Sequence, residues 1–380
     1  MKIGLMGFEF DSANKGCEAL VYSFLDILRD KMDDDEIIVY NFSGTSLGKV
    51  PMSFKSFSFV NVAPELKDIS FNYINKLLQC NFIFDVTMGD SFSDIYSESY
   101  YYRLIKHKRI AEMLCKKYIL LPQTYGPFNS VDSEKKAKKV FKNAYRIYCR
   151  DELSQNLLKD RFGINKSILV SDMAFILPYQ KDLYSFSKRK KIGINISGLL
   201  YKGGFHKENQ FNLSLNYPEL IDKLIFTLSQ DYEVHLIPHV IDLNDNAYDD
   251  DFKICKILNN KFPSTILAPP FSTPIQAKSY ISNMDIFIGS RMHSTIASFS
   301  SGVVTIPISY SRKFEGLFGS LNYPYVINAK LESTDSAYSL INNYIQDENN
   351  LYNAQKTSLE IIKRKNEIFK ESIYQLLQGD

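Results

Sequence analysis

Short apolar runs and stretches with helical periodicity alternate along the whole chain. In the first half, apolar runs predict strands at Lys2–Gly7, Ile37–Asn41, Phe82–Val86, Tyr118–Leu121, Arg146–Cys149 and Ser167–Val170. Between these runs, apolar residues recur with the spacing of one helix face at about Gly16–Lys31, Ser99–Cys115, Asp132–Asn143 and Asp151–Phe162. Strands that alternate with helices in this way are typical of βαβ units, so the first half predicts a parallel sheet covered by helices.

The same alternation starts again after a polar segment, 178–191, which ends in the basic run 188–191. We interpret this segment as an interdomain linker, and its basic run either binds phosphate or is simply solvated. Beyond it, strands are predicted at Lys191–Ile196, Glu233–Ile237, Thr265–Leu267, Asp285–Ile288 and Val303–Ile306. Helices are predicted at about Pro218–Ser229, Asp250–Asn260, Ile275–Asn283, Met292–Ser300, Arg312–Phe318 and Ala354–Leu377.

This restart predicts two α/β domains, at 1–177 and 191–330, followed by a helical segment at 331–380. We expect the long helix of the last segment to brace the N-terminal domain. Open parallel sheets bind ligands outside the carboxyl ends of their strands. The expected architecture is therefore α/β, with two Rossmann-like domains facing a shared cleft.

Composition and absent motifs exclude several classes of protein. The 380 residues carry a formal charge of +2, which gives no reason to expect nucleic acid as a partner. The five cysteines are scattered and form no CxxC, so neither a disulfide framework nor a zinc site is expected, and we predict no metal. The motifs GxGxxG, GxxxxGK(S/T), HExxH and GxSxG are absent. Without a signal peptide or a membrane-length apolar run, we expect a cytoplasmic protein.

Basic residues stand where two predicted helices begin. Arg291 and His293 follow the strand at 285–288, and Arg312 and Lys313 follow the strand at 303–306. A helix N-terminus carries partial positive charge, so cations there are mildly unfavourable unless an anion shares the site. A surface arginine and a neutral, hydrogen-bonded histidine would explain one such case. Two in adjacent βα units favour an anion pocket on the second domain.

Other predicted strand ends also carry polar residues. They are Asn14 and Glu18, Gly89, Asp90 and Ser91, Gln123, Arg150, and His239. Each has a structural alternative, such as a helix cap for Asn14, an ion pair with Asp151 for Arg150, and a buried structural role for His239. The functional alternatives are a contact with a substrate hydroxyl for Asn14 or Glu18, hydrogen bonds from Asp90 and Ser91 to a polyol, and an anion clamp for Arg150.

In their order and spacing, these motifs resemble the polysaccharide pyruvyl transferase family over nearly the whole chain. The shared positions are Asn14, Gly16 and Ala19; Gly126 and Pro127; Arg150 and Asp151; and the segments 172–175, 237–239, 289–293, 300–303 and 309–318. The most specific are the Gly-Ser-Arg-Met-His run at 289–293 and the Ser-Tyr-Ser-Arg-Lys-Phe run that begins at Ser309.

The resemblance implies a two-domain GT-B-type protein of a bacterium. It also implies an enzyme that transfers pyruvyl from phosphoenolpyruvate to a sugar as a ketal and releases phosphate. Arg150, Arg291, His293 and Lys313 are then expected to bind phosphoenolpyruvate, with His293 also catalytic. Glu18 and Asp90 are expected as further catalytic groups, with Asp11 a third candidate base. The acceptor is expected at Asn14, Gly89, Ser91, Gln123 and His239. Phosphoenolpyruvate is a co-substrate, and no cofactor is expected.

Two other functions stay open at this point. One is a GT-B glycosyltransferase that uses a nucleotide sugar, and the other is an inactive homologue that binds glycan or phosphate. The family implies a surface polysaccharide, exopolysaccharide or capsule, or its lipid-linked precursor, as the acceptor. Peripheral contact with the inner membrane is then expected, to which the lysines of 135–142 contribute. A solvated helix face is the alternative for those lysines.

Overall fold

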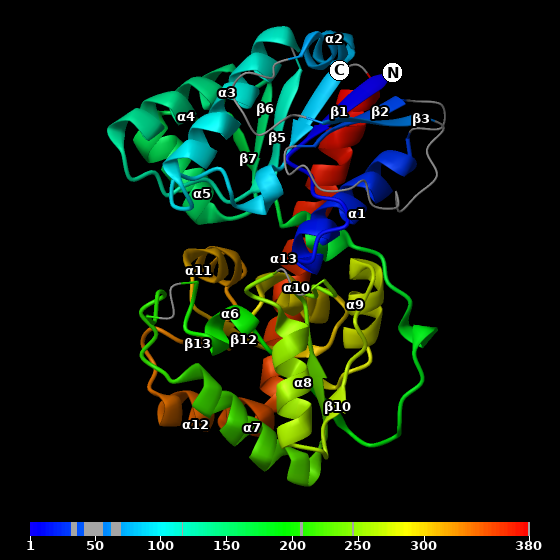
Figure 1. Ribbon diagram of the computed structural model, residues 1–380, viewed down its shortest axis with the longest axis vertical. Helices are drawn as coiled ribbons and strands as arrows, with labels where there is room; N and C mark the ends of the chain where they lie inside the picture. The colour runs from blue at the N-terminus through cyan, green and yellow to red at the C-terminus, as the bar shows by residue number, and fades with distance from the viewer. Residues whose placement is uncertain are drawn as a thin grey trace. The chain divides into compact units, whose positions relative to one another are not determined.

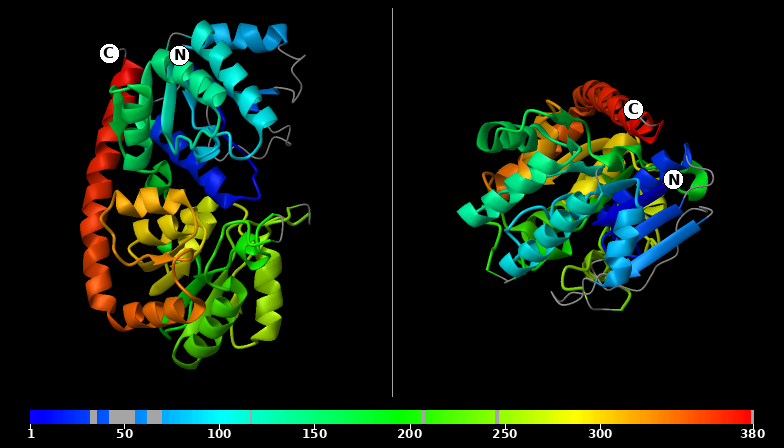
Figure 2. Two further views of the ribbon diagram at one scale, coloured as in Figure 1. Left: turned by 90° about the vertical axis from the view of Figure 1, so that its left-hand side faces the viewer. Right: turned by 90° about the horizontal axis from the view of Figure 1, so that it is seen from above.

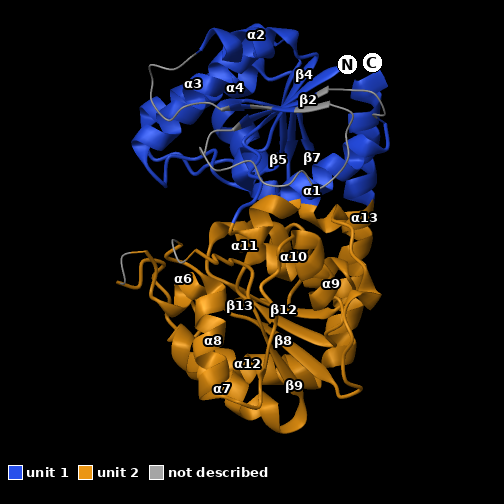
Figure 3. Cartoon of the chain, turned by 45° about the vertical axis from the view of Figure 1, so that its right-hand side comes forward, with its two compact units in different colours: residues 1–12, 20–173, 364–380 blue, residues 13–19, 174–363 orange. Residues whose placement is uncertain are grey.

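The computed structural model describes residues 1–31, 36–41, 56–61, 70–115, 117–205, 208–244 and 247–378. The chain forms two compact units, coloured separately in Figure 3. Unit 1 comprises Met1–Ser12, Leu20–Met173 and Arg364–Asp380, and unit 2 comprises Ala13–Ala19 and Ala174–Lys363. Each unit contains its own parallel sheet, which confirms the prediction of two Rossmann-like α/β units.

The sheet of unit 1 contains seven parallel strands in the order β3-β2-β1-β4-β5-β6-β7. These strands are β1 (Lys2–Met6), β2 (Glu36–Asn41), β3 (Ser56–Asn61), β4 (Phe82–Asp85), β5 (Tyr118–Gln123), β6 (Arg146–Cys149) and β7 (Ser167–Leu169). The strand order reverses direction between β1 and β4. Outside the carboxyl ends of those two strands lies the expected ligand position of this sheet.

Helices cover both faces of this sheet (Figure 1). They are α1 (Lys15–Arg29), whose first residues belong to unit 2, α2 (Phe71–Gln79), α3 (Glu98–Leu114), α4 (Val131–Asn143), α5 (Glu152–Asn156) and the end of α13 (Glu348–Gln378). On one face, buried side chains of α2, α3 and α4 form a single core cluster with the strands. On the other, Phe24 of α1 contacts Phe84 with ring centroids 4.9 Å apart.

The sheet of unit 2 contains six parallel strands in the order β10-β9-β8-β11-β12-β13. They are β8 (Lys191–Asn195), β9 (Glu233–Ile237), β10 (Ile266–Leu267), β11 (Ile286–Gly289), β12 (Val304–Ser309) and β13 (Ile327–Asn328). Its helices are α6 (Gly198–Tyr201), α7 (Tyr217–Asp231), α8 (Asp251–Lys261), α9 (Pro274–Ile281), α10 (Met292–Ser300), α11 (Arg312–Gly319), α12 (Thr334–Gln346) and the start of α13. The order reverses between β8 and β11.

The C-terminal helix α13 is one continuous helix of 31 residues (Figure 2). Its first part belongs to unit 2, where the Gln355 side chain accepts a hydrogen bond from the backbone of Thr305 at 3.0 Å. Its last part belongs to unit 1, where Phe369 contacts the ring of Tyr148 with centroids 5.0 Å apart. The predicted packing of this helix on the N-terminal unit is thus confirmed.

Helix α9 contains a buried lysine, Lys278, that has no acidic partner among the described residues. Lys278 is 1% exposed, and its ammonium donates to the backbone oxygens of Phe175 at 3.3 Å and Leu177 at 2.8 Å. Burial lowers the pKa of Lys278 to about 7. These two bonds attach α9 to the beginning of the segment that leads into β8.

This burial predicts a pH dependence of stability. Between pH 7 and 10 the unfolded chain keeps a proton on Lys278 that the folded chain has lost, so the free energy of unfolding rises with pH. The slope from this one group approaches about 1.4 kcal/mol per pH unit. Lys278→Met should remove that slope in urea unfolding at pH 7, 8 and 9, whereas Lys256→Met, at an exposed position on α8, should keep it. Equal slopes in the parent and Lys278→Met would contradict the buried, neutral amine.

Candidate active site

The carboxyl ends of four adjacent strands in unit 2 place most of the predicted polar residues at one edge of the sheet. β9 leads to His239, β8 to Asn195, β11 to Arg291 and His293, and β12 to Ser309. Strand order reverses between β8 and β11, so this edge is the position where an open α/β sheet binds its ligand. The Asn195 side chain links the ends of the neighbouring strands at this reversal. Its Oδ1 accepts from the backbone N–H of Arg291 after β11 at 2.8 Å, and its Nδ2 donates to the oxygen of Ile237 on β9.

The early turn around Asn14 belongs to this same edge. Asn14 forms an antiparallel bridge with Val240, Lys15 N donates to the His239 oxygen at 3.0 Å, and Ile241 N donates to the Ala13 oxygen at 2.8 Å. The segment 13–19 is therefore part of unit 2, although β1 before it is part of unit 1. The Asn14 side chain accepts from Gly16 N at 2.9 Å, which makes it the cap that the sequence allowed.

Gly16 lies directly against the ring of His293. A Cβ atom on Gly16 would lie 2.3 Å from His293 Nδ1 and 2.7 Å from its Cγ, which no side chain can tolerate without a shift. The glycine of the Asn-x-Gly turn is thus required by the close approach of the histidine. This contact brings Asn14 and His293, nearly 280 residues apart in the chain, to one place.

Glu18 is buried beside this turn and is held by a lysine. Lys15 Nζ lies 2.7 Å from Glu18 Oε2, and both side chains are almost fully buried. Lys15 also donates to the backbone oxygen of Ser272 at 3.3 Å. The predicted carboxylate is therefore positioned by an ion pair on the first turn of α1, in the same unit as His293.

Arg291 is engaged by two carboxylates of the turn before α8. Its guanidinium forms a 2.7 Å bond to Asp251 Oδ1, a 3.0 Å ion pair with Asp249 and a 2.8 Å bond to the Asp249 backbone oxygen. Burial alone would lower the pKa of Arg291, but Asp251 and Asp249 raise it above its usual value. Asp251 also accepts from the backbone N–H groups of Gly198, His239 and Val240. Arg291 thus neutralises the carboxylate that organises the loops of this edge.

His239 is buried, and neither of its ring nitrogens has a hydrogen-bond partner in the part of the chain that the structure describes. Burial lowers the pKa of His239 well below its usual value, and the nearby His293, Arg291 and Lys15 lower it further. The ring is therefore neutral, with one N–H donor and one acceptor nitrogen. An unmade hydrogen bond at a buried polar atom costs about 1–3 kcal/mol, so both atoms favour a polar ligand.

The helix starts after β11 and β12 lack side-chain caps. Arg291 at the start of α10 and Ser311 at the start of α11 make no capping hydrogen bond. The buried hydroxyls of Ser309 and Ser311 also have no hydrogen-bond partner in the protein. Arg312 and Lys313 are half-buried on the first turn of α11. Positive helix ends, two hydroxyl donors and a neutral histidine are groups that bind an anion.

Unit 1 has a buried cation of its own at the end of a strand. Arg150, at the carboxyl end of β6, is 2% exposed; its Nε donates to Thr124 Oγ1 at 2.9 Å and its Nη1 to Asp172 Oδ2 at 2.7 Å. Its Nη2 has no hydrogen-bond partner among the described residues. Gly89 lies beside it, because a Cβ there would be 3.3 Å from Arg150 Nη1. The partner of Arg150 is Asp172 rather than Asp151, which instead caps α5 through Ser154 N.

The other predicted residues of unit 1 lie at the ends of β4 and β5. Asp90 accepts from the Tyr96 hydroxyl at 2.6 Å and is half-buried, and Ser91 is buried. The Gln123 amide donates to the backbone oxygens of Asp85 at 3.0 Å and Leu121 at 3.2 Å, and its Oε1 has no partner in the protein. Among the described residues, no group of three or more His, Cys, Asp or Glu could hold a metal ion.

Comparisons with known proteins identify the family and the fold of the chain. A family model described as polysaccharide pyruvyl transferase matches residues 14–312. A search of curated proteins finds no match. Among solved structures, the chain is similar to UDP-GlcNAc 2-epimerase from Neisseria meningitidis bound to UDP-GlcNAc, at 10% identity and a TM-score of 0.56, covering 99% of this chain and 100% of that chain.

Two further solved structures are also similar over full length. One is the trehalose-6-phosphate protein from E. coli bound with UDP-2-fluoro glucose, at 10% identity and a TM-score of 0.59, covering 100% of this chain and 99% of that one. The other is Anabaena HepE in complex with UDP and glucose, at 12% identity and a TM-score of 0.57, with the same coverage. At these identities the likeness shows the fold alone, and the fold is of the GT-B type.

Proposed function

Because the chain belongs to the polysaccharide pyruvyl transferase family, we propose that it transfers pyruvyl from phosphoenolpyruvate to two hydroxyls of a sugar, forming a ketal and releasing phosphate. The acceptor is a residue of a surface polysaccharide or of its lipid-linked precursor. The observation that supports the proposal is the sheet edge of unit 2, where buried hydroxyls, a neutral histidine and two uncapped helix starts all follow the carboxyl ends of parallel strands.

The donor requires groups for a carboxylate and a phosphate. In the proposal, the starts of α10 and α11, the hydroxyls of Ser309 and Ser311, and Lys313 bind the phosphate. His239 offers one donor and one acceptor nitrogen to the same molecule. Arg150 of unit 1 binds a donor oxygen through its Nη2, which has no protein partner. Arg291 keeps Asp251, and through it the backbone of His239, in place.

The proposed reaction has three bond changes at C2 of the enol. A proton adds to C3, which gives C2 oxocarbenium character, and one sugar hydroxyl attacks C2. The bond from C2 to the phosphate oxygen breaks, and a second hydroxyl closes the ketal. Of the two hydroxyl protons, one balances the proton added to C3 and the other leaves with phosphate. His293 is proposed as the proton donor, and Glu18 or Asp90 as the base that receives a hydroxyl proton.

For the acceptor, we propose contacts with Asn14, His239 and Glu18 of unit 2 and with Gly89, Ser91 and Gln123 of unit 1. Gly89 is included because it lies beside Arg150 in a turn that requires glycine, with a positive φ of 87° and a Cβ position that Leu20 and Arg150 already crowd. The buried amide of Gln123 keeps an open Oε1 that accepts a hydrogen bond.

The deciding experiment measures two products with one protein preparation. Phosphate release from phosphoenolpyruvate, and the pyruvyl mass added to lipid-linked galactose- and mannose-type acceptors, are expected together on at least one acceptor. Nucleotide release from sugar nucleotides is measured in parallel. Nucleotide release without pyruvyl transfer would replace the proposal with a glycosyltransferase. Binding of phosphoenolpyruvate with no turnover on any acceptor would indicate an inactive homologue.

Lys313→Ala tests the donor pocket. Removing this cation from the start of α11 should raise the apparent KM for phosphoenolpyruvate by about tenfold or more, since a charge-assisted bond contributes about 1.5–3 kcal/mol. Steady-state phosphate release at varied donor concentration checks this. Lys330→Ala, at an exposed lysine of the same unit, is the matched control and should leave KM unchanged. An unchanged KM and rate in Lys313→Ala would contradict the pocket.

A further inference from the structure

Helices α3 and α4 of unit 1 lie side by side (Figure 1), and cationic side chains are concentrated on them. We call the surface that they form the basic face. It consists of Lys106 and Arg109 on α3 and of Lys135, Lys136, Lys138, Lys139 and Lys142 on α4. The reaction proposed above uses none of these residues.

Helix stability explains only part of the charge pattern of α4, through the ion pair of Lys136 with Asp132 four residues before it. Both acidic residues, Asp132 and Glu134, stand in the first turn, where they favour the helix dipole, and Lys142 in the last turn does the same. The four lysines between them gain nothing from the dipole. Lys135 and Lys139, and Lys138 and Lys142, are like charges four residues apart, a spacing that destabilises a helix. A chain of formal charge +2 has thus concentrated five lysines on one short helix.

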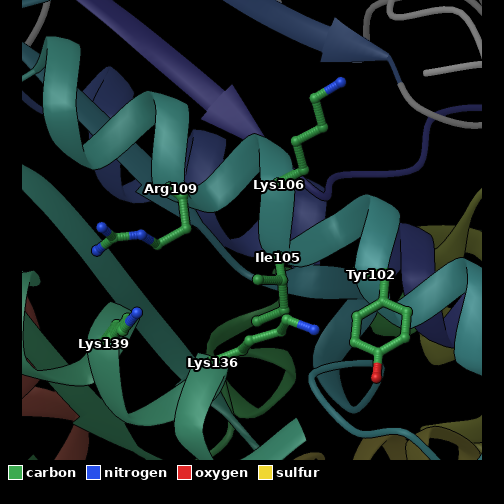
Figure 4. Close-up of a pocket in the computed structure, with 6 residues that line it drawn as sticks. All are labelled: Tyr102, Ile105, Lys106, Arg109, Lys136 and Lys139. Atoms are coloured by element: carbon green, nitrogen blue, oxygen red, sulfur yellow. The ribbon is translucent and has the colours of Figure 1, made fainter. Parts of the chain in front are cut away.

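A hollow of about 340 Å³ lies on this surface. Figure 4 shows the residues that line it, which are Tyr102, Ile105, Lys106, Arg109, Lys136 and Lys139. Lys136 pairs with Asp132 and also lies 3.8 Å from the centroid of the Tyr102 ring, and Arg109 pairs with Glu112. Lys139 forms no ion pair with a described residue. The hollow therefore offers an anion more positive charge than its own acids neutralise.

Apolar side chains extend outward at the same helix faces. Val131 is 68% exposed and precedes Lys135 by one turn on α4, and Met113 is 66% exposed and follows Arg109 by one turn on α3. Large apolar residues in water beside a basic surface are typical of a surface that meets an anionic lipid bilayer, where cations contact headgroups and apolar tips enter the interface. A nucleic acid or a soluble anion would gain nothing from Val131 and Met113.

We propose that the basic face docks on a membrane containing anionic phospholipid. The lysines of α4 lie against the headgroup layer, the hollow receives a headgroup phosphate, and Val131 and Met113 enter the interfacial region. No helix among the residues described is long and apolar enough to cross a bilayer. The contact is peripheral, and it does not depend on the proposed reaction, which uses none of these residues.

Sedimentation with lipid vesicles tests the proposal. The full chain should bind phosphatidylcholine vesicles that contain phosphatidylglycerol, bind vesicles of phosphatidylcholine alone only weakly, and lose binding as salt is raised. The quadruple variant carrying K135Q, K138Q, K139Q and K142Q should bind the anionic vesicles about 100-fold or more less tightly. That estimate follows because each lysine near an anionic surface contributes roughly a factor of five.

A matched variant separates a local surface from total charge. It also removes four exposed lysines, but elsewhere on the chain, through K188Q, K256Q, K356Q and K363Q. This variant should bind anionic vesicles within about threefold of the parent chain. Equal losses in the two quadruple variants would overturn the proposal. Circular dichroism and the unfolding midpoint confirm that both variants fold.

Two further measurements distinguish binding to an anionic bilayer from binding to a soluble anion or a nucleic acid. M113S with V131S should weaken vesicle binding about tenfold while keeping its salt dependence, because it removes apolar contact and no charge. Millimolar inorganic phosphate should not displace the protein from vesicles beyond the effect of its ionic strength. Tight binding of inorganic phosphate without vesicle binding, or equal binding to a polyuridine RNA that M113S with V131S does not change, would overturn the proposal.

Discussion

Replacing His293 with alanine is expected to lower phosphate release and pyruvyl transfer by about 10²–10⁴-fold, the usual contribution of a positioned proton donor or acceptor. His293 lies at the start of α10, next to the buried, neutral His239 and against the backbone of Gly16. The ring is half-buried and contributes little to the core, so the variant should stay folded. Steady-state rates of both products and the urea unfolding midpoint check the two halves of this expectation.

Gly16→Ala is a companion variant, because it keeps both histidines and displaces His293, whose ring and Cβ the new methyl group would meet. Its Cβ would approach Nδ1 to 2.3 Å, so the ring must move from its present position. We expect a loss of rate of at least tenfold with a small change in the free energy of unfolding. Gly319→Ala is the matched control, since a Cβ at Gly319 meets nothing within 4 Å. A near-parent rate in His293→Ala would contradict the catalytic assignment.

Most strands and helices were predictable because their signals are local. The runs at Arg146–Cys149, Glu233–Ile237 and Met292–Ser300 match β6, β9 and α10 to the residue. The missed helix α2 carries a local signal too, a serine cap at Ser70. The missed strands differ: β3 is an edge strand without a continuous apolar run, and β13 has two residues.

The positions of the candidate residues were predictable only where they follow a strand. His239, His293 and Lys313 follow strands of unit 2 as predicted, and the structure places them at one sheet edge, while their roles stay predictions. Two features were not predictable, since both depend on distant residues. The unfavourable charge of Arg291 at a helix start is offset by Asp249 and Asp251, about forty residues away in the chain. The turn at Asn14 joins unit 2 through a backbone bridge to Val240, which no local pattern indicates.

A buried ion pair in unit 1 was missed for the same reason. Lys108 on α3 donates to Asp85 Oδ2 at 2.6 Å and to Thr87 Oγ1 at 2.5 Å, and the Tyr118 hydroxyl donates to the same Asp85 oxygen at 2.5 Å. Lys108 and Asp85 are both almost fully buried. Burial lowers the pKa of Lys108, and Asp85 acts against that shift. The lysine is thus the counter-ion of a carboxylate at the end of β4, where the strand order reverses.

Lys108→Met should therefore lower the free energy of unfolding by about 3–5 kcal/mol, because it leaves the buried carboxylate of Asp85 without a counter-ion. Urea unfolding monitored by circular dichroism gives the midpoint and slope from which this difference is calculated. Lys135→Met makes the same replacement at an exposed position on α4 and should change stability by less than about 0.5 kcal/mol. Combining Lys108→Met with Asp85→Asn removes both charges and should recover part of the loss. Breaking a buried ion pair costs about 3–5 kcal/mol of unfolding free energy. A loss of less than about 1 kcal/mol in Lys108→Met would therefore contradict the assignment of Lys108 as the counter-ion.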